Sequence, residues 1–131
     1  MRLHHLCIET DCYARSLAFY EQALGMALVE ETPGFHGREY NTWLRGDGFF
    51  IELQTPRRGE SLARPEGERA GIAHFCVYAD DLDAACAALR RAGARFLQKG
   101  GADIYEVNGG RLFKVEAPEG TVIEFRDKEG V

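Results

Sequence analysis

The sequence has no long apolar run, no excess of basic residues and no Cys-x-x-Cys pair. Without such a run no helix is expected to span a membrane, and the net charge of −5 argues against a nucleic-acid or anionic-membrane surface. No signal peptide precedes the first strand-like segment, so we expect the four cysteines to be reduced thiols in a cytoplasmic protein. The glycine pairs at 100–101 and 109–110 lack the Lys-Ser/Thr and helix of a phosphate loop and are interpreted as turns.

One pattern occurs twice along the 131 residues. Its first copy opens with His5-Leu6-Cys7-Ile8 and closes with Ile51-Glu52-Leu53, and its second opens with His74-Phe75-Cys76-Val77 and closes with Ile123-Glu124-Phe125. Each half is marginal in size for a fold of its own, so we expect the halves to fold together or across a dimer. The sequence therefore predicts a single domain over 1–131, with module one at about 1–56, a linker at about 57–69 and module two at about 70–131.

Both halves have the same predicted order of elements. Apolar spacing in the first half predicts a strand at 2–9, a helix from a cap at Asp11 to Leu24, and strands at 26–32, 39–45 and 48–55. In the second half it predicts a strand at 72–79, a helix from Asp80 or Asp81 to Gly93, and strands at 94–98, 111–117 and 121–127. The result is an α+β fold of two tandem βαβββ modules, each with helices on one sheet face and the other face free.

The alternation of side chains along the strands places four candidate metal ligands on the helix-free face of the sheet. Residues two apart share a sheet face, so the apolar neighbours of Glu52 and Glu124 face the helices while the two carboxylates point the other way. The same alternation puts His5 and His74 on the helix-free face, and His4 on the helix face. Two imidazoles and two carboxylates suit one divalent cation such as nickel, cobalt, zinc, manganese or iron. Cys7 and Cys76 lie two residues beyond the histidines and are expected to line the pocket rather than bind the metal.

These motifs resemble the vicinal oxygen chelate superfamily, which includes glyoxalase I, extradiol dioxygenases, fosfomycin-resistance proteins and methylmalonyl-CoA epimerase. The matching stretches are 3–6, 16–20, 24–26, 50–53, 71–75 and 118–125, so the resemblance covers nearly the whole chain. It implies a glyoxalase-like fold in which the two modules form a metal-binding cup. The set of four is most similar to bacterial glyoxalase I, which isomerises the hemithioacetal of methylglyoxal and glutathione. The resemblance therefore implies one divalent metal on His5, Glu52, His74 and Glu124, in a homodimer whose sites lie within one chain or across the interface.

Two positions depart from glyoxalase I: Glu9 stands where that family has Arg, and Pro56 where it has Asn. Both family residues help to hold glutathione, and Arg to Glu reverses the sign of that anchor. We therefore expect a glyoxalase I-like lyase or isomerase that acts through a metal-stabilised enediolate, on another small vicinal-oxygen substrate at least as readily as on a glutathione adduct.

Roles can be assigned to the residues of the helix-free face. Glu124 is expected to be the catalytic base, with Glu52 as the second choice, because near-twofold symmetry puts them on opposite sides of a substrate. Arg126 can anchor a substrate carboxylate or phosphate. The predicted substrate pocket consists of Glu9, Phe50, Gln54, Tyr78 and Arg126.

Three other functions compete with this one. Extradiol ring cleavage needs Fe(II) on two His and one Glu, so Glu52 would occupy a position required by catechol or O₂. Methylmalonyl-CoA epimerase is similar in its ligands, but its second glutamate has no match here. A non-enzymatic drug-sequestering protein of this fold commonly works without metal, and the complete set of four ligands argues against that role.

Overall fold

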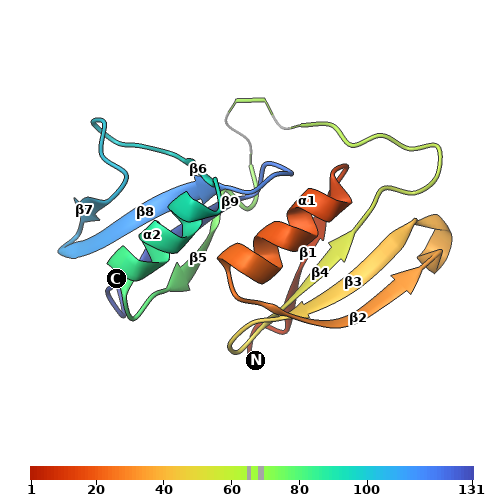
Figure 1. Cartoon of the computed structure of the whole chain (residues 1–131), viewed down its shortest axis with the longest axis horizontal. Helices are drawn as coiled ribbons and strands as arrows, with labels where there is room; N and C mark the ends of the chain where they lie inside the picture. The colour runs from red at the N-terminus through yellow and green to blue at the C-terminus, as the bar shows by residue number, and fades with distance from the viewer. Residues whose placement is uncertain (65, 68–69) are drawn as a thin grey trace. The chain divides into compact units, whose positions relative to one another are not determined.

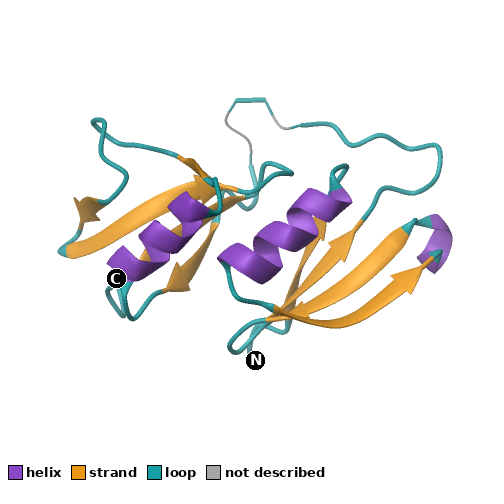
Figure 2. Cartoon of the chain, in the orientation of Figure 1, coloured by secondary structure: helices purple, strands orange, loops and turns teal. Residues whose placement is uncertain are grey.

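The computed structural model describes residues 1–64, 66–67 and 70–131, which divide into two compact units, Met1–Arg64 and Pro65–Val131. Each unit pairs one sheet with one main helix, which confirms the α+β fold of two modules (Figures 1 and 2). Residues 57–64 of the predicted linker belong to the first unit, whereas positions 65, 68 and 69 lie outside the described residues. Within the described ranges, no helix has the length and apolar character needed to cross a membrane.

The first unit is a four-stranded sheet in the order β1-β4-β3-β2. β1 runs parallel to β4, and the β3–β4 and β2–β3 pairs are antiparallel. The predicted hairpin around residues 46–48 is confirmed, but the first strand is shorter than predicted and begins at His5. The strands are β1 (His5–Glu9), β2 (Ala27–Pro33), β3 (Tyr40–Arg45) and β4 (Phe50–Gln54).

The first helix begins differently from its prediction. α1 (Tyr13–Ala18) continues into a π-helical turn, η1 (Phe19–Ala23), and a short 3₁₀ turn, η2 (Phe35–Gly37), follows β2. The predicted cap at Asp11 is wrong, because the N-cap residue is Cys12, and within the described part of the chain no side chain caps this helix end. Asp11 instead forms an ion pair with Arg64 at 2.8 Å. The left-handed Gly25 (φ 65°) ends the helical segment as predicted, since glycine adopts that conformation without a Cβ clash.

The second unit is a five-stranded sheet in which β5-β9-β8-β6 are neighbours and β7 also pairs with β8. Asp81 caps the helix as predicted, since its side chain accepts the Ala84 N–H at 2.9 Å. The first strand of this unit starts at Phe75 rather than Ile72, and β7 lies between the two glycine pairs, in a stretch to which the sequence assigned no strand. The elements are β5 (Phe75–Tyr78), α2 (Leu82–Arg91), β6 (Arg95–Phe96), β7 (Tyr105–Val107), β8 (Gly110–Glu116) and β9 (Val122–Arg126).

The apolar core of each unit lies under its helix. Residues that flank the two candidate glutamates are fully or almost fully buried, which fixes the register of β4 and β9 because a one-residue slip would expose them. In the second unit the rings of Phe113 and Phe125 stack with centroids 4.8 Å apart. The buried flanking residues are Ile51, Leu53, Ile123 and Phe125.

Candidate functional site

In the first unit, His5 and Glu52 lie next to each other. β1 and β4 are parallel and in register, with Cys7 opposite Glu52, so the side chain at the start of β1 reaches the middle of β4. The His5 Nε2 atom is 3.7 Å from Glu52 Oε2. The Glu52 side chain is 15 % exposed, which leaves its carboxylate shielded but reachable.

The second unit repeats this arrangement with the same register. Cys76 lies opposite Glu124 on the parallel strands β5 and β9. His74 immediately precedes β5, and its Nε2 atom is 3.4 Å from Glu124 Oε2. The Glu124 side chain is only 9 % exposed. Each unit therefore presents one imidazole–carboxylate pair, built from equivalent positions.

Neutral donors and aromatic rings surround the pair of the first unit. Gln54 Nε2 donates to Glu52 Oε1 at 3.0 Å and to the buried Asn41 Oδ1 at 2.6 Å. The Trp43 ring packs edge-on against His5, and Phe50 stacks on His4. The prediction that His4 lies on the helix face is wrong. His4 precedes β1, so the strand alternation does not apply to it, and its ring packs against these residues.

Cations surround the pair of the second unit. Lys114 lies opposite Glu124 in the β8–β9 hairpin, and its Nζ atom is 3.2 Å from Glu124 Oε2. Arg126 Nη1 is 4.0 Å from the other carboxylate oxygen, and Tyr78 is the register neighbour of Arg126 on β5. Sequence reasoning missed Lys114. Counting outward from the turn at 118–120 pairs it with Glu124 and would have found it.

The two thiols next to the glutamates are held in their protonated form. Burial, with the nearby Glu52 charge, raises the pKa of Cys7 to about 11. Burial and the Glu124 charge raise the pKa of Cys76 in the same way, and its Sγ–H donates to Glu124 Oε1 at 3.6 Å. In the absence of a metal, both residues therefore act as neutral lining of the site near neutral pH.

The charge of Glu9 is compensated within the first unit. Arg38 Nη1 lies 2.7 Å from Glu9 Oε1 and also donates to the Thr55 carbonyl oxygen at 2.5 Å. Arg38 is a further residue that sequence reasoning missed, because it approaches Glu9 from a loop far along the chain. Glu9 is thus paired with a guanidinium, although its negative charge is opposite to that of the arginine expected at this position from the resemblance.

The donors of each pair fit a divalent cation. Two atoms bound to one ion at about 2.1 Å are about 3.0–3.6 Å apart for bond angles between about 90° and 120°. The 3.4 Å separation of the His74 pair lies in this range, and the 3.7 Å of the His5 pair requires only a small side-chain rotation. Among the described residues, no three His, Cys, Asp or Glu side chains form a group that could hold a metal. Nitrogen and carboxylate donors suit the transition metals named above.

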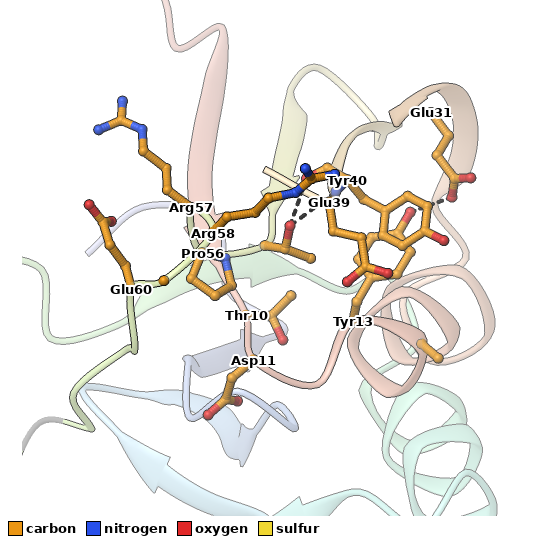
Figure 3. A pocket seen from close by; sticks show the side chains of 13 residues that line it. Thr10, Asp11, Tyr13, Glu31, Glu39, Tyr40, Pro56, Arg57, Arg58 and Glu60 are labelled. Carbon is orange, nitrogen blue, oxygen red and sulfur yellow. Dashed lines mark hydrogen bonds between the residues drawn. The ribbon is translucent and has the colours of Figure 1, made fainter. Parts of the chain in front are cut away.

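A separate pocket of about 690 Å³ lies in the first unit, near the start of α1 (Figure 3). The rings of Tyr13 and Tyr40 stack in its wall with centroids 4.5 Å apart, and Tyr13 donates a hydrogen bond to Glu31. Pro56 also lines it, whereas none of the four candidate ligands does. The lining residues are Thr10, Asp11, Tyr13, Ala14, Glu31, Glu39, Tyr40, Thr55, Pro56, Arg57, Arg58, Gly59 and Glu60.

Comparison with known proteins agrees with this architecture. YwkD of Bacillus subtilis, described as an uncharacterized protein, is 33 % identical over 93 residues, which are 70 % of this chain and 71 % of that protein. A glyoxalase family protein from Enterococcus faecalis has a similar structure, with a TM-score of 0.78, 19 % identity and coverage of 95 % of both chains. Lactoylglutathione lyase from Agrobacterium tumefaciens gives a TM-score of 0.67 and 19 % identity, over 95 % of this chain and 91 % of that one.

At these identities the two solved structures show a shared fold and nothing about activity. The family model is the stronger finding. It matches residues 2–125, a span that includes both imidazole–carboxylate pairs and all but the last residue of the strands around them. The chain therefore belongs to the Glyoxalase/Bleomycin resistance protein/Dioxygenase superfamily.

Proposed function

We propose that this protein is a metal-dependent lyase or isomerase of the glyoxalase I type, acting on a small substrate with vicinal oxygens. One divalent cation would be held by His5, Glu52, His74 and Glu124. The observation that carries the proposal is the repeat of one imidazole–carboxylate pair at equivalent register positions in the two units. If the two pairs served only to stabilise their own units, nothing would require the same residue types at the same positions in both.

The cation would act as a Lewis acid toward two neighbouring substrate oxygens, stabilising negative charge that develops when an adjacent C–H bond loses its proton. Glu124 is proposed as the residue that takes this proton and Glu52 as the one that returns it. Phe50, Gln54 and Tyr78 would form walls around the substrate. The Glu9–Arg38 ion pair would lie at the position that holds glutathione in the family, so another small substrate is expected to be used at least as readily as a glutathione adduct.

Metal binding is the first test. Purified protein would be titrated with nickel, cobalt, manganese and zinc, and bound metal measured by elemental analysis and calorimetry. One ion per chain is expected for the unmodified protein, with a large loss of affinity in His74→Ala. His36→Ala is the matched control, since His36 is an exposed histidine outside both pairs. Less than a tenth of an equivalent of any metal, with no uptake on titration, would exclude the proposed centre.

Proton transfer is the second test. Deuterium exchange at the carbon next to the carbonyl would be followed by NMR, using methylglyoxal with several thiols. Glu124→Gln should slow this exchange by at least about 100-fold, and Glu52→Gln should slow formation of the isomerised product to a similar degree, while part of the metal stays bound. Full exchange in Glu124→Gln, or full product formation in Glu52→Gln, would exclude that glutamate from the role proposed for it.

The proposal includes a homodimer, and mixing variants shows where the ligands of one site come from. A His5→Ala/Glu52→Ala chain and a His74→Ala/Glu124→Ala chain would be unfolded and refolded together. Regained metal binding would indicate sites shared between subunits, and none would indicate sites within one chain. The four free cysteines support a reducing compartment, and we expect the protein to act in the cytoplasm.

A ligand-sequestering role is the second candidate, favoured by the aromatic cluster next to His5. This cluster consists of four rings whose contacting pairs have centroids no more than 6.4 Å apart: His4, His5, Trp43 and Phe50. Such a surface suits a planar apolar ligand. Such a binder would retain its ligand after removal of all metal by a chelator. Loss of ligand binding together with the metal would instead favour the enzyme.

A further inference from the structure

Two cations face a single carboxylate in the second unit. Lys114 approaches one oxygen of Glu124 at 3.2 Å and Arg126 approaches the other at 4.0 Å. The three side chains carry two positive charges and one negative charge, so the group has an excess of one positive charge. Their side chains are between 9 % and 26 % exposed, and at this degree of shielding an uncompensated charge costs more than it does in open solvent.

Arg126 is the less satisfied of the two cations. Its 4.0 Å contact with Glu124 is too long for a hydrogen bond, and its buried Nε–H finds no acceptor among the described residues. Such a donor set, with a planar guanidinium and an ammonium next to each other, matches the oxygens of an anion. If Glu124 also binds a metal, its charge is shared further, which increases the positive excess.

The equivalent positions of the first unit hold uncharged residues. Trp43 pairs with Glu52 as Lys114 pairs with Glu124, and Gln54 follows Glu52 by two residues as Arg126 follows Glu124. Neither residue of the first unit carries a charge. The fold therefore does not require cations at these positions, and packing of the β-hairpin does not explain them.

We infer that Lys114 and Arg126 form an anchor for an anionic substrate group, a carboxylate or a phosphate, bound beside Glu124. The inference rests on the proposed function, to which it adds the class of substrate: a small hydroxycarbonyl compound with a negatively charged end. Tyr78, exposed at the register position next to Arg126, adds a hydroxyl to the same surface. Arg126 and Lys114 act as binding residues for that end, and the glutamates act on the vicinal oxygens.

A matched set of probes tests the anchor. Dihydroxyacetone, hydroxypyruvate and dihydroxyacetone phosphate share one hydroxymethyl ketone unit and differ in a neutral, carboxylate or phosphate end. Their dissociation constants would be measured by calorimetry and ligand-observed NMR on metal-loaded and chelator-treated protein. The unmodified protein should bind at least one anionic probe about tenfold or more tightly than dihydroxyacetone. The probe with the larger preference identifies the end group as carboxylate or phosphate.

Charge-removing variants assign that preference to residues. Lys114→Gln and Arg126→Gln should each reduce it about tenfold, read as the ratio of the dissociation constants of dihydroxyacetone and the preferred anionic probe. Arg95→Gln is the matched control, because it removes the same charge from a 70 % exposed side chain on β6 that forms an ion pair with Glu116. Circular dichroism checks the fold. If Arg126→Gln does not fold, Arg126→Lys takes its place, because it keeps the charge and loses only the fork of donors.

Two outcomes separate this inference from the proposed function. Equal affinity for the three probes, or a preference untouched by both Lys114→Gln and Arg126→Gln, overturns the anchor even when metal and exchange activity are present. A preference that depends on these residues, in protein that binds no metal, supports the anchor and overturns the proposed enzyme.

Discussion

The reactivity of Cys76 reports the charge of Glu124 directly. Burial, then the Glu124 carboxylate, raises the pKa of this thiol from 9.0 to about 11. At pH 8 a thiol with a pKa of about 11 is about 0.1 % ionised, and one with a pKa of about 9 is about 10 % ionised. Replacing Glu124 with Gln removes the charge while keeping the shape, so the thiolate fraction of Cys76 should rise.

The expected acceleration is smaller than the change in ionisation. A fall of two pKa units would increase the thiolate about 100-fold but reduce its nucleophilicity about eightfold, so the limit is about tenfold. Burial is the largest cause of the raised pKa and persists in the variant. We therefore expect iodoacetamide to alkylate Cys76 about two- to fivefold faster in Glu124→Gln, with the rates read by mass spectrometry of the Cys76 and Cys7 peptides.

Two further variants provide the controls. Glu52→Gln should accelerate Cys7 rather than Cys76, because Glu52 is the carboxylate next to Cys7. Lys114→Gln should slow Cys76, since the Lys114 ammonium lowers its pKa. Equal effects of the two glutamate variants on both thiols, or no effect of Glu124→Gln on Cys76, would refute the arrangement of charges described here.

Three other predictions concern stability. Asp81→Ala removes the helix cap and should cost about 1 kcal/mol in the free energy of unfolding measured with urea, whereas Asp80→Ala, one residue earlier, should cost little. Phe113→Ala empties a fully buried site and should cost about 3–5 kcal/mol by the same measurement. Burial and the hydrogen bond to Glu31 raise the pKa of Tyr13 from 10.0 to about 12, so its contribution to stability is complete below pH 10 and is lost as the pH rises to 12. In Tyr13→Phe this alkaline loss of stability should be smaller, as thermal melts between pH 9 and 12 would show.

Strand periodicity was sufficient to predict the faces of the sheets. Burial of the residues on either side of Glu52 and Glu124 leaves one face for these carboxylates, and alternation is a property of the backbone that no distant contact changes. The repeat then supplied the partners, because the same strand pairing in both halves brings each histidine to its glutamate. The prediction failed for His4, which lies outside the strand whose alternation was applied to it.

Contacts made by loops and by the starts of helices could not be predicted from the sequence. Arg38 follows a 3₁₀ turn and reaches Glu9 across the sheet, and no local pattern fixes where such a side chain goes. The cap of α1 was assigned to Asp11 because Asp is a preferred cap, but this carboxylate binds Arg64 instead. The capping propensity of a residue type is therefore a weak predictor wherever a distant side chain competes for the same carboxylate.

The asymmetry between the two units bears on how a substrate would be oriented. Under the proposed function, two identical pairs on one metal ion would accept a hydroxyketone in either direction, because exchanging the pairs would leave the ligands unchanged. The cations next to Glu124 and the neutral and aromatic neighbours of Glu52 remove that equivalence. Under the proposed function, an anionic end beside Arg126 leaves only one direction, so the two glutamates would face different carbons of the substrate. Loss of orientation in Arg126→Gln would therefore appear as deuterium exchange at the hydroxymethyl carbon of dihydroxyacetone phosphate that survives Glu124→Gln, because Glu52 could then face that carbon, whereas Glu124→Gln alone should abolish this exchange.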